Sequence, residues 1–585
     1  MASPAVPVSP LHRPSSFNFT RDVVDHWAQR DPSQLALHWA DQSLTSTKQL
    51  TYAHFSRQSH RIATLLTSLG IKQGETCIII LPRVPEWWEF ATACLRSGVV
   101  LCPCTTLLVA KDIEYRLQIS HAAAFVGDEA SVAKCLSVAS KCPQLRTVIK
   151  IEANNGSKAP SSQIQQVTDF HAALARIPED VTFPVPNALT STSPALTFFT
   201  SGTTGPPKMV LHTQISYPLA HALTGIHWLQ LDPSKTYWNL SEQGWAKASW
   251  SWFSSWNCGS TLFVHDDRLA FDPRRTLKVL HDFPITTLCA PPTVYRQLVL
   301  DENRALFETE QGRPRALTHC CGAGEPLNES VIRVWKEMTD GIEIYDAYGQ
   351  TETVVVCANQ AANPVKLGSM GKPIAGVPLT IVDAEGNVTK DGEEGDIAVE
   401  VTNGKDEQES KFFGIFEGYI DKATGKIDNK VNTFSNGRRY YITGDRASRD
   451  ADGYFWFVGR NDDVINSAGY RIGPFEVEST LKQHHSVVES AVVASPDVQR
   501  DEVVKAFVVL TDSAAANVKD NGSRDKLVRE LQDFCKEHAA PYKYPRKIEF
   551  VDAKFLPKTI SGKIRRGELK ALEKKRYQEA NGAKL

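Results

Sequence analysis

The residues best suited to chemistry form one run, residues 200–208, which reads Thr-Ser-Gly-Thr-Thr-Gly-Pro-Pro-Lys. Small hydroxyl and glycine residues leave backbone N–H groups accessible, and the lysine adds positive charge. Such groups together bind phosphate. The run follows an apolar stretch, ALTFF, as a loop follows a strand. The sequence therefore predicts a phosphate-binding loop, with an ordinary Ser/Thr/Gly surface loop as the alternative.

Two other nucleotide-binding motifs are excluded. The nucleoside-triphosphatase loop requires a lysine beside its second glycine, but two prolines follow Gly205. The pair Gly562-Lys563 fails the same pattern, because Pro557 stands at the position of the first glycine. A dinucleotide fingerprint is also absent, since Leu327 occupies the place of its third glycine. The predicted loop must therefore bind phosphate in another way.

Four more motifs follow the loop along the chain: YGQTE at 348–352, YITGD at 441–445, GRNDD at 459–463 and PKTISGK at 557–563. With these five motifs in this order, the chain resembles the superfamily of adenylate-forming enzymes, which includes acyl-CoA synthetases, luciferases and peptide-synthetase adenylation domains. The resemblance covers nearly the whole chain. Within the superfamily, residues 459–474 and 540–550 look most like medium-chain acyl-CoA synthetases.

The resemblance implies an ATP site and its catalytic residues. Lys563 would reach the α-phosphate and the substrate carboxylate, Thr351 would hydrogen-bond the α-phosphate, and Glu352 would be a Mg²⁺ ligand. Asp445 and Arg460 would hold the ribose, and the segments around residues 324 and 346 would wall the adenine. The full implied ATP-binding set is Thr200, Ser201, Gly202, Thr203, Thr204, Gly205, Lys208, Gly324, Glu325, Asp346, Ala347, Tyr348, Gly349, Gln350, Thr351, Asp445, Arg460 and Lys563.

The resemblance also implies a CoA site and a hinge. Asp462 would be the hinge about which a small domain rotates between adenylation and thioester formation. Gly469, which has no side chain, would let the pantetheine arm approach closely. The implied CoA-binding residues are Ala468, Gly469, Tyr470, Arg471, Arg500, Tyr544 and Arg546.

The implied acyl pocket is formed by Trp245, Ala248, Ser249 and Gly349, with Trp250, Trp252 and Trp256 nearby. Acetyl-CoA synthetases resemble this chain but carry a bulky tryptophan just before Gln-Thr-Glu. Gly349 stands there instead, so an acid longer than acetate should fit. Tryptophans at near-helical spacing are also typical of a core. Medium straight-chain, branched and aromatic acids remain open, and no basic counter-ion for a diacid is obvious.

The elements that must position these residues follow an α/β pattern. From about residue 17 to 453, short β-branched runs alternate with helical stretches, which favours parallel sheets flanked by helices. After Gly453 comes a compact α+β module. We expect a large N-terminal adenylation domain of several subdomains, residues 1–460, and a small mobile C-terminal domain, residues 461–585. Residues 541–580 contain 12 Lys or Arg residues and 5 Asp or Glu residues. This excess of positive charge indicates either a solvated basic face or a surface that binds anionic ligands.

Composition excludes several classes of protein. The 585 residues are 42% hydrophobic and 23% charged, with a net charge of −2, unlike a disordered chain or a nucleic-acid-binding polycation. No apolar run is long enough to span a bilayer, and the N-terminus lacks a secretory signal. The 12 cysteines lack zinc-ligand spacing, which indicates reduced, buried thiols in an intracellular protein.

The sequence thus predicts an AMP-forming acyl-CoA ligase (an acid–thiol ligase) that uses ATP, Mg²⁺ and CoA. The alternatives are an adenylating enzyme that loads a carrier protein, or a luciferase-like oxygenase. The last residues, Ala583-Lys584-Leu585, are a variant of the Ser-Lys-Leu peroxisomal address. We therefore expect a peroxisomal import receptor as a partner, with a cytoplasmic or mitochondrial location as the alternative.

Overall fold

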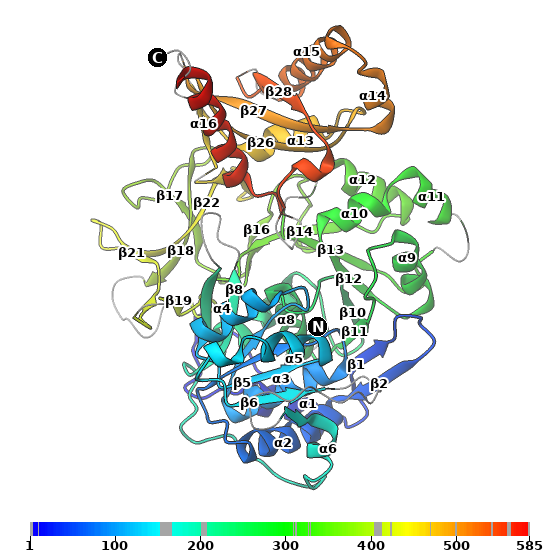
Figure 1. Ribbon diagram of the computed structural model, residues 1–585, viewed down its shortest axis with the longest axis vertical. Helices are drawn as coiled ribbons and strands as arrows, with labels where there is room; N and C mark the ends of the chain where they lie inside the picture. Colours follow the sequence, from blue (N-terminus) through cyan, green and yellow to red (C-terminus); the bar gives the residue numbers. More distant parts are fainter. Residues whose placement is uncertain are drawn as a thin grey trace. The chain divides into compact units, whose positions relative to one another are not determined.

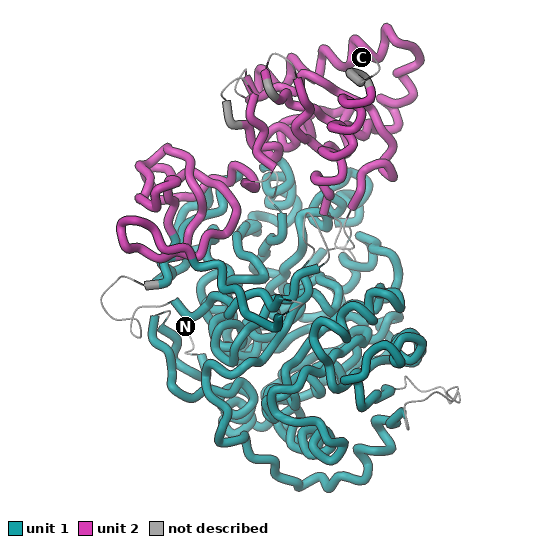
Figure 2. The backbone as a smooth tube through the Cα atoms, turned by 60° about the vertical axis from the view of Figure 1, so that its left-hand side comes forward, with its two compact units in different colours: residues 1–200, 207–379, 400–431 teal, residues 201–206, 380–399, 432–585 magenta. Residues whose placement is uncertain are grey.

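The computed structural model describes residues 4–9, 11–151, 167–200, 207–307, 309, 313–325, 327, 329–402, 412–421, 424–461, 463–467, 470–497, 500–539, 542–558 and 563–582. The chain divides into two compact units, coloured separately in Figure 2. Unit 1 comprises residues 1–200, 207–379 and 400–431, and unit 2 comprises residues 201–206, 380–399 and 432–585. Residues 380–399 and 432–460 thus group with the C-terminal part. The expected rotation about Asp462, which lies outside the described residues, stays a prediction.

Unit 1 contains two nine-stranded sheets, each parallel through its centre (Figure 1). The first has the order β16 (Lys372–Pro373), β15 (Val355–Ala358), β14 (Ile344–Gly349), β13 (His319–Ala323), β12 (Thr287–Ala290), β10 (Thr236–Asn239), β11 (Thr261–His265), β1 (Leu35–Ala40) and β2 (Thr47–Thr51). The second has the order β20 (Ile427–Asp428), β19 (Gly418–Ile420), β9 (Lys208–Thr213), β8 (Pro194–Thr200), β4 (Val100–Pro103), β3 (Thr76–Ile80), β5 (Ala124–Gly127), β6 (Thr147–Lys150) and β7 (Val167–Asp169).

Helices connect these strands, as parallel sheets require. They are α1 (Asp25–Arg30), α2 (Tyr52–Ser68), α3 (Pro85–Ser97), α4 (Ala110–Ser120), α5 (Glu129–Leu136), α6 (Phe170–Leu174), α7 (His221–His227), α8 (Ala246–Asn257), α9 (Pro273–Asp282), α10 (Pro292–Leu298), α11 (Asp301–Phe307) and α12 (Glu329–Met338). Local sequence fixes their starts: the Thr51 hydroxyl caps α2 by accepting from the His54 N–H, and Asp272 caps α9 before Pro273. None of the described helices could cross a membrane.

Unit 2 contains two antiparallel-based sheets. One has the order β17 (Leu379–Val382), β18 (Glu394–Thr402), β22 (Arg439–Arg449) and β21 (Val431–Thr433), with β23 (Phe455–Arg460) paired to β22. The other has the order β25 (Tyr470–Ile472), β24 (Ile465–Ser467), β27 (Asp501–Leu510) and β26 (Val487–Asp497), with β28 (Lys547–Phe550) paired to β27. Its helices are α13 (Pro474–Leu481), α14 (Asp512–Asn517), α15 (Asn521–His538) and α16 (Arg566–Gly582). The predicted α/β class is confirmed.

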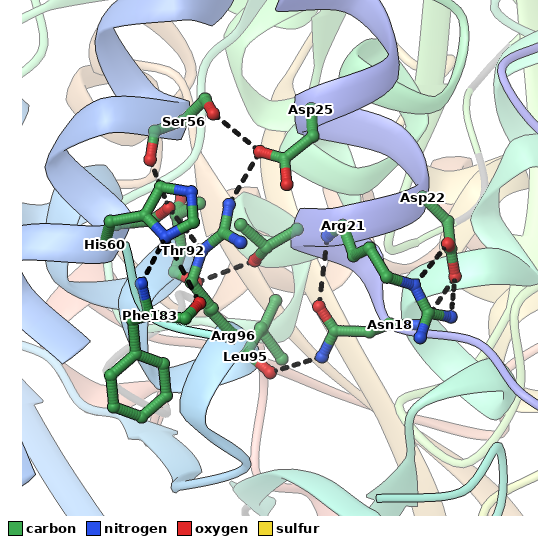
Figure 3. A network of polar contacts seen from close by, with 12 residues as sticks. Asn18, Arg21, Asp22, Asp25, Ser56, His60, Thr92, Leu95, Arg96 and Phe183 are labelled. Atoms are coloured by element: carbon green, nitrogen blue, oxygen red, sulfur yellow. Dashed lines mark hydrogen bonds and ion pairs between the residues drawn. The ribbon is translucent and has the colours of Figure 1, made fainter. Parts of the chain in front are cut away.

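A buried ion pair joins three helices near the N-terminus (Figure 3). The Arg96 guanidinium on α3 is 2% exposed and donates to Asp25 on α1 at 2.6 Å. It also donates to the Ser59 hydroxyl on α2 at 2.7 Å. Since a buried charge is costly without partners, these bonds fix how α1, α2 and α3 pack. All 12 cysteines are buried and free, as their spacing predicted.

Candidate active site

The predicted phosphate-binding loop connects two paired strands. Thr200 at the end of β8 lies opposite Lys208 at the start of β9, so the two ends of the predicted loop are adjacent. Residues 201–206, which include Ser201, Gly202, Thr203, Thr204 and Gly205, lie outside the described residues. The carbonyl of Pro207 accepts a hydrogen bond from the Tyr115 hydroxyl at 2.8 Å. The far end of the loop is therefore anchored to α4, and Lys208 is exposed beside it.

Lys208 and Glu352, far apart in the sequence, both contact Tyr419 on β19. The Tyr419 hydroxyl donates to Glu352 Oε1 at 2.7 Å, and Lys208 Nζ lies 4.9 Å from the centre of the Tyr419 ring. Strand β19 pairs with β9, which brings Tyr419 to this place. The backbone carbonyl of Glu352 also accepts from the Phe416 N–H at 2.9 Å. The predicted metal ligand is thus held next to the lysine of the phosphate loop, and sequence reasoning missed Tyr419.

A buried histidine fixes the backbone of Thr351. Because a carbonyl can only accept, His212 Nε2 donates to the Thr351 carbonyl, at 2.7 Å. Nδ1 then accepts from the Ser216 hydroxyl, at 3.0 Å. Burial lowers the pKa of His212 to about 4, so the ring is neutral near pH 7 and keeps this arrangement of one donor and one acceptor. In the sequence, His212 is a lone histidine in an apolar strand. That pattern does not distinguish a histidine that positions Thr351 from one that only packs in the core.

The two segments expected to wall the adenine are adjacent. In the parallel pairing of β13 and β14, Gly322 lies opposite Asp346 and Ala323 opposite Ala347. Gly324 follows with a φ of +114°, which favours glycine, and a Cβ there would meet nothing within 4 Å. The next residue, Glu325, forms an ion pair with Arg296 at 3.0 Å. Open space therefore lies against this backbone, at the carboxyl ends of parallel strands where α/β proteins bind ligands.

Among the residues expected to contact the adenine, Asp346 has a strongly shifted pKa. Its side chain is buried, and desolvation raises its pKa to about 7. Hydrogen bonds from the Leu327 and Ala347 N–H groups and the charge of Lys247 oppose that shift. A carboxyl group that titrates near neutral pH can accept or donate a hydrogen bond.

The segment expected to line the acyl pocket forms α8 and the residue before it. Trp245 is the N-cap of α8 and is half-buried, whereas Ala248 and Ser249 are buried. The Ser249 hydroxyl has no hydrogen-bond partner among the residues that the structure describes. A Cβ on Gly349 would lie 2.5 Å from the Val354 carbonyl oxygen, so a side chain does not fit at this backbone. Backbone packing alone therefore explains why glycine stands at position 349. Its effect on the length of the acid stays a prediction.

The three tryptophans near the expected acyl pocket, Trp250, Trp252 and Trp256, are buried and pack against other aromatic rings. Trp252 and Trp256 are fully buried and pack against each other with their ring centres 5.4 Å apart. Trp252 also contacts Phe19, and Trp256 contacts Phe55, so both belong to the core. Trp250 is also buried, and its ring packs against His221 at 5.9 Å and Trp228 at 5.8 Å. Lys247 lies on the first turn of the same helix. The sequence did not indicate it as a site residue, because it is a single lysine among small and aromatic residues.

In unit 2, the two residues expected to hold the ribose are direct neighbours. Asp445 on β22 is the cross-strand partner of Arg460 on β23. The Asp445 carboxylate is 6% exposed and the arginine is exposed. An acceptor and a charged donor are thereby presented side by side, as two ribose hydroxyls require.

Lys563 lies at the end of a short loop closed by backbone contacts. Lys558 and Ile564 form an antiparallel bridge, and the Arg565 N–H donates to the Pro557 carbonyl at 2.8 Å. Residues 559–562 lie outside the described residues. Lys563 is exposed, directly precedes Ile564, and lies three residues before Arg566, where helix α16 begins. The backbone on either side of residues 559–562 is therefore held together.

A basic and aromatic patch, residues 536, 544 and 546, lies on unit 2. The Tyr544 ring is flanked by Lys536 Nζ at 4.7 Å and by the Arg546 guanidinium at 4.9 Å. Lys536 was not predicted. Of the other expected CoA residues, Arg500 is half-buried at a turn where its N–H donates to Asp497. Ala468, Gly469 and the side chains of Tyr470 and Arg471 lie outside the described residues.

Comparison with known proteins shows the family to which the chain belongs. Residues 24–403 match the family described as AMP-binding enzyme, and residues 476–563 match the AMP-binding enzyme C-terminal domain. The chain is 43% identical over 572 residues to acyl-coenzyme A synthetase ACSM4, mitochondrial, of Homo sapiens, covering 96% of this chain and 91% of that protein. The relative's name gives a mitochondrial location, so the comparisons do not support the expected peroxisomal one.

Solved structures agree with the fold. The anthranilate CoA ligase AuaEII in complex with anthranoyl-AMP superposes with a TM-score of 0.78 at 25% identity, covering 97% of this chain and 99% of that one. An acyl-CoA synthetase from Brucella canis superposes with a TM-score of 0.68 at 30% identity, covering 97% of both chains. The resemblance stated from the motifs is thereby confirmed over nearly the full length.

Proposed function

Because this chain belongs to the AMP-binding enzyme family and, within it, to the acyl-coenzyme A synthetases, we propose that it is an AMP-forming acyl-CoA ligase for acids longer than acetate. The observation that carries the proposal is the contact of Lys208 and Glu352 with the same tyrosine beside the phosphate loop. The reaction has two steps: the acid attacks the α-phosphorus of ATP and releases pyrophosphate, and the CoA thiol then displaces AMP.

In the first step, the phosphate loop and the predicted residues from 324 to 352 would position ATP. The loop at 200–208 would hold the β- and γ-phosphates, and Lys208 would add charge at its end. The wall of Gly324, Glu325, Asp346, Ala347 and Tyr348 would take the adenine. His212 keeps Thr351 in place through its carbonyl, and the Thr351 hydroxyl would hydrogen-bond the α-phosphate. Most of the rate enhancement would come from such positioning and from neutralising charge.

The residues fit a Mg²⁺ ion. Mg²⁺ prefers one or two carboxylates together with phosphate oxygens, and Glu352 offers a carboxylate fixed at one oxygen by Tyr419. The carboxylate would bind the ion through its other oxygen. The bound ion would neutralise developing charge on the phosphates.

Groups of unit 2 would complete both steps. Asp445 and Arg460 would hold the ribose hydroxyls. Lys563 would stabilise the negative charge that develops on the α-phosphate as the acid attacks. In the second step, rotation about Asp462 would exchange Lys563 for the segment Ala468-Gly469-Tyr470 at the thiol. Tyr544, Arg546 and Lys536 offer a ring and two cations for the adenine and phosphates of CoA, with Arg471 and Arg500 as further cations.

The acid is best sought among medium straight-chain, branched and aromatic acids. The test is a panel from two to sixteen carbons plus aromatic acids, each with ATP, Mg²⁺ and CoA, in which AMP release and CoA consumption are both followed. We expect equal AMP release and CoA consumption with at least one acid longer than acetate. AMP release without CoA consumption would instead favour transfer to a carrier protein or an oxygenase. No AMP release with any acid would overturn the proposal.

The last three residues, Ala583-Lys584-Leu585, support a peroxisomal location, whereas the named relative is mitochondrial. Both locations suit an acyl-CoA ligase. Fusion of the last dozen residues to a fluorescent protein tests the first: peroxisomal puncta would support an import receptor as partner, and a diffuse signal would exclude this use of the tripeptide.

A further inference from the structure

Lys247 brings a positive charge to the end of the first sheet. It is the second residue of α8, and its Nζ donates to the Ala323 carbonyl oxygen on β13 at 3.1 Å. The ammonium also lies close enough to Cys289 on β12 and Asp346 on β14 to favour their ionised forms. Strands β12, β13 and β14 are neighbours in the sheet, as Figure 1 shows. Lys247 therefore sits at the carboxyl ends of three parallel strands, where a ligand is expected.

The nearest carboxyl group to act on this charge, Asp346, is not in ion-pair contact with it among the residues that the structure describes. A lysine ammonium has three donors, and one of them is used in the hydrogen bond to the Ala323 carbonyl. No carboxylate in the described part of the chain forms an ion pair with it. The side chain is half-buried, so water reaches it only in part. Donors held at a ligand-binding edge without a direct ion pair are suited to an acceptor group on the ligand.

The same edge also offers an acceptor. Asn239 ends β10, and its amide nitrogen approaches the Lys247 carbonyl at 3.5 Å. Its Oδ1 is buried and has no partner among the residues that the structure describes. A buried acceptor without a donor is costly unless a ligand or water supplies one. A hydroxyl on the ligand could supply the donor that the Asn239 oxygen lacks.

We propose that Lys247 selects acids that carry a neutral oxygen group, a hydroxyl or a carbonyl, away from the carboxylate that is activated. The inference rests on the proposed function and adds the substrate class. Lys247 donates to that oxygen, and a hydroxyl in addition meets the Asn239 acceptor. The residue determines specificity and takes no part in bond making.

A neutral oxygen suits the site better than a second carboxylate. Asp346 lies at the same edge and, with a pKa of about 7, carries a negative charge in a large fraction of molecules near neutral pH. Glu325, beside Ala323, adds another carboxylate, which is already paired with Arg296. A second carboxylate on the acid would be repelled by Asp346 while it is attracted by Lys247. A hydroxyl or carbonyl gains the hydrogen bond without that repulsion.

The experiment compares kcat/KM for matched acids in the wild type and Lys247→Met. The pairs are benzoate against its three monohydroxy isomers, and straight-chain acids of six to twelve carbons against their hydroxy and keto forms. We expect the wild type to prefer at least one oxygenated acid over its plain match by about 10- to 100-fold, the range for a hydrogen bond to a charged group. Lys247→Met should remove that preference and improve the plain acids, while Lys247→Arg should restore part of it.

Lys278→Met, which removes an exposed lysine on α9 paired with Asp282, is the matched control and should keep the wild-type preference. The proposal is overturned if the wild type shows no preference in any pair. It is also overturned if Lys247→Met keeps the preference or raises the KM for ATP alone, since the lysine would then serve the nucleotide. These outcomes differ from failure of the proposed function, in which no acid of either class gives AMP release.

Discussion

Arg566 donates two hydrogen bonds to the buried carboxylate of Glu478, from Nη2 to Oε2 at 2.6 Å and from Nε to Oε1 at 3.0 Å. Glu478 is 2% exposed and also accepts from the Val492 N–H at 2.8 Å, so it belongs to the fixed core of unit 2. Arg566 begins α16, three residues after Lys563. Its Nη1 lies 3.8 Å from Asp463, the neighbour of the expected hinge residue. The pair thus ties the base of the Lys563 loop to the core and to the hinge segment.

From this relationship we predict that Arg566 positions Lys563. Arg566→Met should lower acid-dependent pyrophosphate exchange by at least about 10-fold, because the loop loses its anchor. It should also destabilise unit 2 by about 3–5 kcal/mol, because Glu478 is left buried and unpaired. Pyrophosphate exchange and thermal unfolding measure the two effects.

A double variant separates positioning from stability. In Arg566→Met with Glu478→Leu, no buried charge remains, so the melting temperature should recover. Pyrophosphate exchange should stay low, since the anchor is still missing. Recovery of exchange together with the melting temperature would assign Arg566 a structural role alone.

Lys563 itself should matter for one half-reaction. Lys563→Ala should reduce acid-dependent pyrophosphate exchange by about 10²–10³-fold, as loss of a preorganised charge donor does. Transfer of a supplied acyl-adenylate to CoA should continue. The exposed Lys554, nine residues earlier, provides the control, and Lys554→Ala should change neither step. Equal loss of both half-reactions in Lys563→Ala would argue against this assignment.

The sequence predicted the class of fold and the residues of the motifs, because phosphate loops and short catalytic motifs are local. The neighbours that hold them could not be predicted in the same way. Tyr419 reaches Glu352 only because β19 pairs with β9, and His212 reaches Thr351 from another strand. Such contacts depend on register between distant segments. The tryptophan pattern on α8 was ambiguous for a related reason: spacing gives the face of a helix but not what covers it, and Trp252 and Trp256 proved to be core.

The basic and aromatic patch should serve CoA alone. Lys536→Gln and Arg546→Gln should each raise the KM for CoA by about 10-fold, the effect of losing one charged contact to phosphate. The KM values for ATP and for the acid should not change. Lys575→Ala, an exposed lysine on α16, is the charge-matched control. An equal rise in the KM for ATP would mean that the patch is not specific to CoA.

Glu242 should make stability depend on pH. Burial raises its pKa from 4.5 to about 7, although the Thr105 hydroxyl donates to it at 2.9 Å and the charge of Arg83 lies nearby. The folded protein therefore binds this proton more tightly than the unfolded chain does. The resulting stability is complete below the unfolded pKa and is lost as pH rises to about 7.

Glu242→Gln tests this because it keeps the shape and removes the titration. The melting temperature of the variant, relative to that of the wild type, should be higher at about pH 8 than at about pH 5. Asp346, whose pKa is also about 7, titrates in both proteins and cancels in the comparison. A difference that does not change with pH would show that Glu242 is ionised throughout.

The Asp25–Arg96 ion pair should make the two single substitutions non-additive in the free energy of unfolding. Arg96→Met leaves a carboxylate that still accepts from Ser56, and Asp25→Asn leaves a guanidinium that is 2% exposed. Each single variant should lose about 3–5 kcal/mol of unfolding free energy, measured by urea denaturation. The double variant, which buries no unpaired charge, should lose less than the sum of the two. Additive losses would mean that the two side chains stabilise the helices independently, and that the 2.6 Å contact contributes nothing of its own.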